Sequence, residues 1–226
     1  MSLYGDAGPR YRDRADAGRV LAEKLSPHRD RDAMVLAIPN GGVPVGAVIA
    51  EALDAELYLM IVRKLKIPDN PEAGFGAVAA DGFLLLNKRL LDRLGLTESQ
   101  VLQQKEEALL SIRSRQALFG ARAEPPPMTD RTVVLVDDGL ASGFTMEVAV
   151  RSARNQGAGQ IIIAVPTSSM SAYRRLKPLV EEIICPDVSR LPIFAVANAY
   201  VHWYDLEEQE VLALLEGMGK KGRAGT

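Results

Sequence analysis

Short apolar runs alternate along this chain with longer segments in which apolar residues recur at helical spacing. The runs with the length of buried strands are Met34 to Ile38, Leu57 to Val62, Val133 to Val136, Ile161 to Val165 and Ile183 to Cys185. The segments with helical spacing are Asp13 to Leu25, Val43 to Leu53, Thr97 to about Leu118, Thr145 to Asn155, Ala172 to Val180 and Leu206 to Leu215. This alternation predicts an α/β fold, an open parallel sheet flanked by helices, with ligands at the carboxyl ends of the strands.

A smaller antiparallel element interrupts the alternation. Asp81-Gly82 separates Ala77 to Ala80 from Phe83 to Asn87, and an Asp-Gly pair suits a tight turn that needs positive φ. The preceding segment, Pro68 to Gly76, contains two prolines and two glycines and is expected to be a loop. The sequence therefore predicts a hairpin inserted between core units.

Composition is that of an ordinary globular protein. The 226 residues are 47% hydrophobic and 25% charged, which allows one main core. We assign residues 1–216 to a single domain that includes a small hood, and we expect 217–226 to be a flexible tail. Lys plus Arg is 27 and Asp plus Glu is 29, for a net charge of -2, so a nucleic-acid or membrane partner is not expected from charge. Phosphate recognition must be local.

Cysteine usage and hydropathy bear on location. The one cysteine, Cys185, has no partner for an internal disulfide and no clustered histidines for a metal site, so we interpret it as a small buried hydrophobe. Residues 1–14 lack the apolar core of a signal peptide, and no stretch approaches the roughly 18 apolar residues that span a bilayer. We expect a cytoplasmic protein.

The segment from Val133 to Thr145 carries the most informative chemistry. It reads VVLVDDGLASGFT: a buried strand, the carboxylates Asp137 and Asp138, and a loop of small residues. The loop glycines let backbone amides turn inward, and the helix that follows points its positive N-terminus at the same space. A phosphate monoester would be held there, with hydroxyl groups as additional donors.

Two other interpretations of this segment explain less. Asp137 and Asp138 can cap a turn, but turn capping does not account for adjacent carboxylates followed by a glycine-spaced loop with Ser and Thr. A P-loop nucleotidase requires a Lys before Thr145, where this chain has Phe144.

These thirteen residues resemble the motif that binds 5-phosphoribosyl-1-pyrophosphate (PRPP) in type I phosphoribosyltransferases. The resemblance implies that fold, and it implies that Asp137 and Asp138 engage the ribose hydroxyls directly or through Mg²⁺. It assigns the 5-phosphate of PRPP to Gly139, Leu140, Ala141, Ser142, Gly143, Phe144 and Thr145.

A second loop, Ile38 to Gly46, reads IPNGGVPVG and resembles the pyrophosphate loop of the same family. Its paired glycines have amides that can face a diphosphate, although a tight strand-to-helix turn would need glycines too. One branch of the family carries Arg in place of Asn40. The spacing is not the G-x-G-x-x-G of dinucleotide-binding oxidoreductases. The resemblance assigns pyrophosphate to Pro39, Asn40, Gly41 and Gly42.

Arg63 and Lys64 end the second apolar run. Type I enzymes commonly place a basic residue there, against the pyrophosphate and a neighbouring subunit, although a basic strand end is often simply solvated. The resemblance makes Asp137, Asp138 and Lys64 the candidate catalytic residues, and it adds Arg63 and Lys64 to the pyrophosphate contacts. The segment Val62 to Val78 resembles the same branch, and Pro68 to Gly76 is either the mobile loop that closes type I sites or an ordered surface loop.

The resemblance implies transfer of the phosphoribosyl group to a nitrogen acceptor, with Mg²⁺ as cofactor, pyrophosphate as product and a homodimer by analogy. Enzymes of 6-oxopurines usually carry Asp where this chain has Ala141, so we expect hypoxanthine and guanine to be poor acceptors. The aromatic group formed by Tyr200, His202, Trp203 and Tyr204 either stacks on a base or packs on the core. The alternative is a non-catalytic regulator that binds PRPP or a nucleotide. No DNA-binding helix pair is evident, whereas an RNA-binding surface would not show in the sequence.

Overall fold

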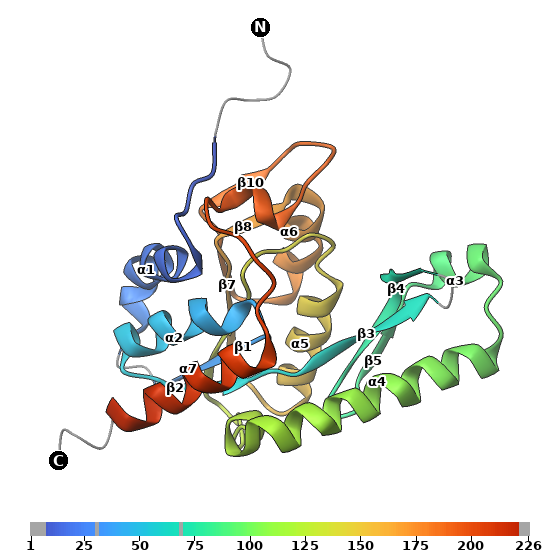
Figure 1. Ribbon diagram of the computed structural model, residues 1–226, viewed down its shortest axis with the longest axis horizontal. Coiled ribbons are helices and arrows are strands. Elements are labelled where there is room, and N and C mark those ends of the chain that lie inside the picture. The colour runs from blue at the N-terminus through green and yellow to red at the C-terminus, as the bar shows by residue number, and fades with distance from the viewer. Residues whose placement is uncertain (1–7, 30–31, 68–69, 222–226) are drawn as a thin grey trace, which may run out of the picture.

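The computed structural model describes residues 8–29, 32–67 and 70–221. At its centre is a five-stranded parallel sheet with the order β2-β1-β6-β7-β9 (Figure 1). The strands are β1 (Ala33–Ala37), β2 (Glu56–Leu59), β6 (Thr132–Val136), β7 (Gln160–Ala164) and β9 (Glu182–Ile184). The predicted α/β fold and its parallel sheet are confirmed, with small shifts at the strand ends.

Alternate residues of the strands bury opposite faces of this sheet. Val35, Val134 and Ile162 lie in register and belong to the core on one face, which also includes residues of α1 (Arg14–Leu25), α2 (Gly42–Leu53) and α7 (Glu208–Lys221). Leu135 and its neighbours face α5 (Phe144–Asn155) and α6 (Met170–Leu176) on the other side (Figure 1). Burial of each such side chain stabilises the fold by about 1.5–3 kcal/mol.

The chain between β2 and β6 builds an arm that projects from this core (Figure 1). Strands β3 (Val62–Ile67), β4 (Asn70–Ala79) and β5 (Leu84–Leu86) form an antiparallel sheet, followed by helices α3 (Lys88–Leu94) and α4 (Glu98–Phe119). We call residues 62–119 the arm. The predicted hairpin is its β4–β5 unit, in which Gly82 has a φ of 83°. The predicted long helix is α4, and α3 was not predicted.

Two expectations for the start of the arm are wrong. The run from Leu57 to Val62 is not one strand, because β2 ends at Leu59 and β3 begins at Val62 in a different sheet. Arg63 and Lys64 therefore lie within an antiparallel strand instead of at the end of a parallel one. The reason is nonlocal: β3 pairs with β4 along its whole length.

The expected loop from Pro68 to Gly76 is also wrong over its described part. Residues from Asn70 onward belong to β4, and 68–69 lie outside the described residues. A Cβ at Gly76 would lie 2.6 Å from the carbonyl oxygen of Leu85, so this glycine permits close strand approach and does not mark a loop.

The hood lies at the carboxyl ends of the parallel strands. It contains the short pair β8 (Thr167–Ser169) and β10 (Asp187–Ser189) and the 3₁₀ turn η4 (Val196–Ala199). The two strands were not predicted, because three residues are too few for a periodic pattern.

Two helix ends differ from the sequence prediction. Helix α6 starts earlier and ends at Leu176, before Pro178. Helix α7 runs to Lys221, past the expected end at Leu215, so residues 217–221 of the expected tail are helical and 222–226 lie outside the description.

Candidate functional site

A cleft of about 540 Å³ opens where the arm meets the carboxyl ends of β1 and β6. Its size suits a small-molecule ligand, for which pockets of about 300–1,000 Å³ are usual. Four segments far apart in the sequence form its walls. We call it the arm cleft, and it is lined by Ile38, Pro39, Asn40, Gly41, Val62, Arg63, Lys64, Lys66, Gln104, Glu107, Ala108, Ser111, Asp137 and Thr145.

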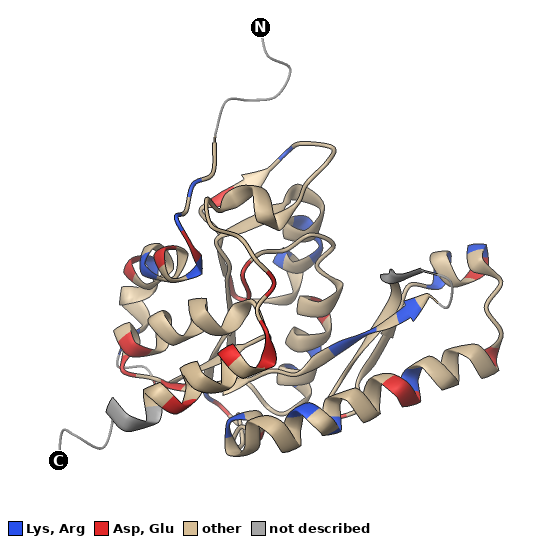
Figure 2. Ribbon diagram, viewed as in Figure 1, with Lys and Arg blue, Asp and Glu red and all other residues tan. Residues whose placement is uncertain are grey.

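Strand β3 gives the arm cleft its positive charge (Figure 2). Lys64 and Lys66 are exposed, and Arg63 is half-buried. The Arg63 Nε donates a hydrogen bond to Ser111 Oγ on α4 at 2.9 Å, which fixes the guanidinium against the arm. Burial, together with the charge of Arg115, lowers the pKa of Arg63. Three cations in one wall suit a ligand with several phosphate charges. Lys66 was not predicted as a site residue, because it joins Arg63 and Lys64 in one wall only when this segment forms strand β3.

Asp137 and Asp138 follow β6 and differ in what they face. Asp137 lines the cleft and its Oδ1 accepts a hydrogen bond from the Asp138 amide at 2.9 Å. Burial, reinforced by the neighbouring Asp138 charge, raises the pKa of Asp137 well above its usual range. Burial also raises the pKa of Asp138, and the Arg14 charge opposes that rise.

The Asp138 carboxylate is directed at Arg14. The Arg14 Nε lies 2.9 Å from Asp138 Oδ2, and the side chains are 7% and 14% exposed. Arg14 also donates to the Tyr204 carbonyl oxygen at 3.0 Å, and its guanidinium lies 4.1 Å from the centroid of the Trp203 ring. Arg14 was not predicted from the sequence. The available signal was an arginine on the buried face of α1, in line with Ala17 and other buried residues.

The side chains of residues 139–145, which the resemblance assigns to the 5-phosphate and which we call the phosphate loop, point in different directions. Leu140 is buried and exchanges backbone hydrogen bonds with Thr167 and Ser169, at 3.0 and 2.9 Å. Thr145 lines the arm cleft, whereas the Phe144 ring lies beneath the Arg175 guanidinium at 4.2 Å. The side chains of Leu140 and Phe144 therefore do not contribute to the cleft. The Leu140 N–H is already used by Thr167, so of these two residues only Phe144 can offer its backbone to a ligand.

Glycines shape the remainder of the loop. Gly143 precedes α5 with a φ of 75°, a conformation that favours glycine. A Cβ at Gly139 would lie 2.5 Å from the Val196 side chain. Ala141 and Ser142, between them, are exposed. The loop thus presents small residues ahead of the α5 N-terminus, where the helix dipole favours an anion.

The loop after β1 packs directly on the acidic pair. A Cβ at Gly41 would overlap the Asp138 carboxylate, and one at Gly42 would lie 2.7 Å from the Val136 carbonyl oxygen. The Asn40 Nδ2 donates to the Leu206 carbonyl oxygen at 2.7 Å, and the Pro39–Asn40 peptide bond is cis. Asn40 Oδ1 is buried without a hydrogen-bond partner among the described residues. Asn40 therefore ties the loop to the C-terminal segment and leaves one acceptor unused.

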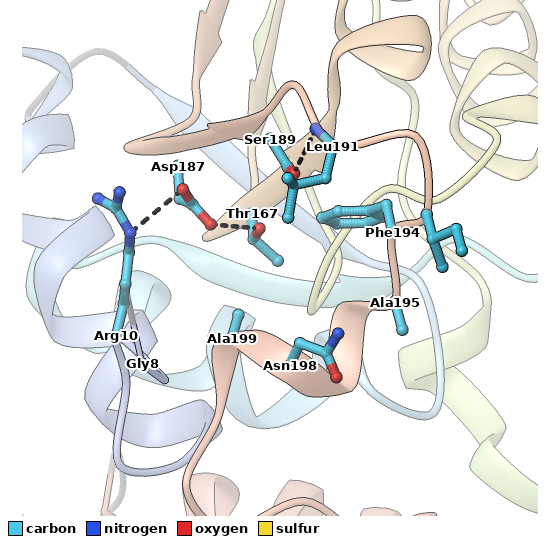
Figure 3. Close-up of a pocket in the computed structure, with 11 residues that line it drawn as sticks. Gly8, Arg10, Thr167, Asp187, Ser189, Leu191, Phe194, Ala195, Asn198 and Ala199 are labelled. Carbon is cyan, nitrogen blue, oxygen red and sulfur yellow. Dashed lines mark hydrogen bonds and ion pairs between the residues drawn. The ribbon is translucent and has the colours of Figure 1, made fainter. Parts of the chain in front are cut away.

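A second, smaller cavity of about 160 Å³ lies in the hood (Figure 3). The Asp187 carboxylate there accepts from Thr167 Oγ1 at 2.8 Å and pairs with Arg10 at 3.2 Å. Phe194 and Asn198 face it from the other side (Figure 3). The carbonyl oxygen of Thr167 also accepts from the phosphate loop, so this hood cavity shares a wall with that loop. No local sequence signal marked it.

The aromatic group near the C-terminus is divided between the protein interior and the surface. Tyr200 is buried, donates its hydroxyl to the Asp138 carbonyl oxygen at 2.6 Å, and packs on Trp203 with ring centroids 5.2 Å apart. Tyr200 and Trp203 thus pack on the core, as one of the two interpretations expected. Tyr204 and His202 are exposed and line a different cavity.

Cys185 is half-buried, and its thiol contacts the Asp187 carbonyl oxygen at 3.2 Å. Burial raises the pKa of this thiol to about 12. Such a thiol is unreactive at neutral pH, in line with a packing role.

Neither a group of three metal-binding side chains nor a helix that could cross a membrane occurs among the described residues. Within residues 8–29, 32–67 and 70–221, no three His, Cys, Asp or Glu side chains are grouped to hold a metal ion. The oxygen donors in the cleft, the Asp137 carboxylate and the unpaired Asn40 Oδ1, fit an ion such as Mg²⁺ that binds mainly through its substrate. Over the same ranges, no helix has both the length and the apolar character needed to cross a bilayer.

Known proteins are similar to this chain in sequence and in fold. The family model described as phosphoribosyl transferase domain matches residues 11–189. A Mycobacterium tuberculosis H37Rv protein named "Putative phosphoribosyl transferase Rv0571c" is 34% identical over 206 residues, which are 91% of this chain and 46% of that protein. The chain thus spans about half the length of this relative. The crystal structure of TT1426 from Thermus thermophilus matches with 33% identity and a TM-score of 0.76, covering 92% of this chain and 99% of that one.

Proposed function

Because the chain belongs to the phosphoribosyl transferase domain family, we propose that it transfers the 5-phosphoribosyl group of PRPP to a nitrogen acceptor and releases pyrophosphate. The observation that carries the proposal is the arm cleft, which gathers the loop after β1, the cations of β3, Asp137 and Thr145. These are the groups that a molecule with a phosphate at each end of a sugar requires.

PRPP would bind with its parts along the arm cleft. The diphosphate lies against the backbone amides of Asn40 and Gly41, because Pro39 has no N–H and the Gly42 N–H donates to the Ile38 carbonyl oxygen at 3.0 Å. It also meets the cations of β3. Asp137 accepts hydrogen bonds from the sugar hydroxyls, and Asp138 lies directly behind it. The 5-phosphate meets the amides of residues 141–145 and the Thr145 hydroxyl at the start of α5.

The reaction forms a bond from the acceptor nitrogen to C1 of the ribose and breaks the bond from C1 to the diphosphate oxygen. The electron pair of the broken bond leaves with pyrophosphate, and positive charge develops on the sugar ring. Asp137 stabilises that positive charge, and the β3 cations stabilise the departing diphosphate. When bound, Mg²⁺ would neutralise diphosphate charge, and Asp137 and Asn40 Oδ1 are the protein groups that would hold it, because the Asp138 carboxylate is paired with Arg14.

The acceptor is a nucleobase or related nitrogen compound. Ala141 is exposed in the phosphate loop and offers no carboxylate to a purine ring. We expect hypoxanthine and guanine to react at least about tenfold more slowly than the best acceptor, because a missing hydrogen-bond partner weakens transition-state binding. Competing acceptors measured at equal concentration with purified protein check this, and rapid turnover of either purine would contradict it.

The proposed function is tested by screening nucleobases and amines for PRPP-dependent pyrophosphate release with Mg²⁺. Turnover with one acceptor, lost in Asp137→Asn, supports transfer. Calorimetry with PRPP and nucleoside monophosphates runs in parallel. Tight PRPP binding without turnover of any acceptor would identify a non-catalytic regulator instead, and failure of the native chain to bind PRPP would exclude both.

A further inference from the structure

Arg14 connects three parts of the molecule that lie far apart in the sequence. It is on α1, its Nε bonds Asp138 Oδ2 at 2.9 Å across 124 residues of sequence, and its Nη1 bonds the Tyr204 carbonyl oxygen at 3.0 Å. The guanidinium face covers the Trp203 ring at 4.1 Å. The edge and the face of this guanidinium are therefore both engaged inside the protein.

Asp138 in turn lies between the loop after β1 (residues 39–42) and the loop after β6 (residues 139–145). We call these the two ligand loops. Its backbone belongs to the phosphate-binding segment, and its carboxylate fills the space that a Cβ at Gly41 would need. The position of this carboxylate therefore determines how closely the loop after β1 approaches the segment after β6. A shift of Asp138 would change the distance between the groups proposed to hold opposite ends of PRPP.

The C-terminal segment from Tyr200 to Leu206 is bonded to both loops. Tyr200 donates to the Asp138 carbonyl oxygen at 2.6 Å, and Asn40 donates to the Leu206 carbonyl oxygen at 2.7 Å. Arg14 adds the bond to Tyr204. The segment is thus hydrogen-bonded to the loop after β1, to Asp138 and to Arg14.

The chemistry of this contact requires arginine. A buried carboxylate without a partner takes up a proton or moves toward water, whereas a buried cation left alone is costly. A guanidinium donates in two directions in one plane and stacks on an indole with its face, whereas a lysine ammonium supplies charge and three donors on one atom but no planar face. At Arg14 all three properties are used.

We infer that Arg14 is a positioning residue of the donor site, which acts through Asp138 to hold the two ligand loops in register and to couple them to Trp203. The inference rests on the proposed function in that PRPP is the ligand these loops hold. Arg14 does not line the arm cleft, so its effect on binding is indirect.

The first test measures PRPP affinity by calorimetry with Mg²⁺ in excess. We expect Arg14→Gln to weaken binding at least about tenfold, or about 1.4 kcal/mol, and Arg14→Lys to recover part of the loss. Arg19→Gln is the matched control, because Arg19 is on the same helix, is 51% exposed and pairs only with Asp16 among the described residues. It should bind within about twofold of the native chain.

A double-variant cycle separates an indirect role from direct contact. If Arg14 acts through Asp138, Arg14→Gln changes PRPP affinity by less than about twofold in an Asp138→Asn background, because the two residues form one unit. Independent, additive losses would overturn the inference. Where Asp138→Asn lowers affinity beyond detection, the cycle is read on the midpoint of urea unfolding, and additive midpoint shifts would likewise overturn it.

Trp203 provides a readout that needs no ligand. It is the one tryptophan of the chain, so emission excited selectively from indole reports on the Arg14 contact. We expect Arg14→Gln and Asp138→Asn each to shift the emission of the folded protein, and Arg19→Gln to leave it unchanged. Circular dichroism confirms folding, and Arg14→Lys replaces Arg14→Gln if the latter unfolds. Emission that ignores both residues would overturn the inference.

The two measurements distinguish the inference from the proposed function. A native chain whose Trp203 emission depends on Arg14 and Asp138 but which binds no PRPP contradicts the proposed function. A native chain that binds PRPP, with Arg14→Gln binding it equally well, contradicts the inference alone. Addition of PRPP should change Trp203 emission in the native chain and not in Arg14→Gln.

Discussion

At the scale of single residues, the two carboxyl groups after β6 have opposite relations to stability. Asp137 is buried beside a second carboxylate without a cation of its own, and its pKa is raised well above the usual range. Asp138 forms the buried pair with Arg14. The first group is destabilising when ionised, and removal of the second leaves a cation unpaired.

We therefore predict opposite signs for two chemically identical substitutions. Asp137→Asn should raise the free energy of unfolding, because a neutral amide replaces a carboxyl whose ionised form is disfavoured by burial and by Asp138. Asp138→Asn should lower it by about 3 kcal/mol, because Arg14 remains buried without its counter-charge. Urea unfolding of the three proteins at pH 7 checks this. Equal effects of the two substitutions would show that the buried pair contributes nothing.

The raised pKa of Asp137 also predicts a pH dependence. The folded state binds this proton more tightly than the unfolded state, so its stabilising effect is complete below about pH 4, the unfolded pKa. The effect is lost as pH rises through the folded pKa. The native chain should therefore lose stability relative to Asp137→Asn from about pH 4 toward neutrality, as urea unfolding at several pH values would show. A constant difference across that range would contradict the raised pKa.

At the scale of elements, the junction of β1 with α2 depends on the absence of a side chain. Gly41 precedes α2 with a φ of -60°, which any residue can adopt, so its backbone does not require glycine. The requirement is space, because a Cβ would overlap the Asp138 carboxylate. The element boundary and the acidic pair are thus fitted to each other.

Gly41→Ala should accordingly separate the loop from the acidic pair. We predict a loss of PRPP affinity of at least about tenfold, equivalent to about 1.4 kcal/mol, measured by calorimetry. Gly217→Ala is the control, since nothing lies within 4 Å of its added Cβ in α7. That variant should bind PRPP normally and gain about 0.5–1 kcal/mol of stability. Native affinity in Gly41→Ala would show that the loop accommodates the methyl group.

At the scale of the whole molecule, the arm projects from the core (Figure 1) and carries exposed leucines. Leu102 and Leu110 on α4 are each 58% exposed, and α4 also lines the arm cleft through residues such as Ser111. The homodimer that the family resemblance implies would cover such surface, since exposed leucines on a projecting element favour association.

We predict that the native chain sediments as a dimer and that Leu102→Glu combined with Leu110→Glu sediments as a monomer. The physical reason is the cost of burying two carboxylates in an apolar contact. Ile193→Glu is the control, because Ile193 is 82% exposed but lies in the hood. Sedimentation velocity checks all three proteins, and a monomeric native chain would exclude the dimer.

Local patterns in the sequence were sufficient to predict most strands and helices of the core. The central strands β1 and β6 are buried at every position, so each reads as an uninterrupted apolar run such as Val133 to Val136. The helices show their apolar spacing, and Asp81-Gly82 indicates its turn. The two ligand loops were identifiable because the residues proposed to bind phosphate are contiguous in the chain.

Contacts between distant segments were decided only by the tertiary structure. Whether residues after Asn70 form a loop or a strand depends on pairing with β3, which no local pattern records. The partner of Arg14 is 124 residues away, and the cations of β3 line one cleft with Asp137 only because the arm begins beside the carboxyl ends of β1 and β6. Local propensity acts between near neighbours along the chain, whereas ion pairs and clefts form between residues brought together by burial. The sequence by itself therefore determined the fold class and the position of the two loops proposed to bind PRPP, and the tertiary structure decided how Arg14 and Asp138 join them.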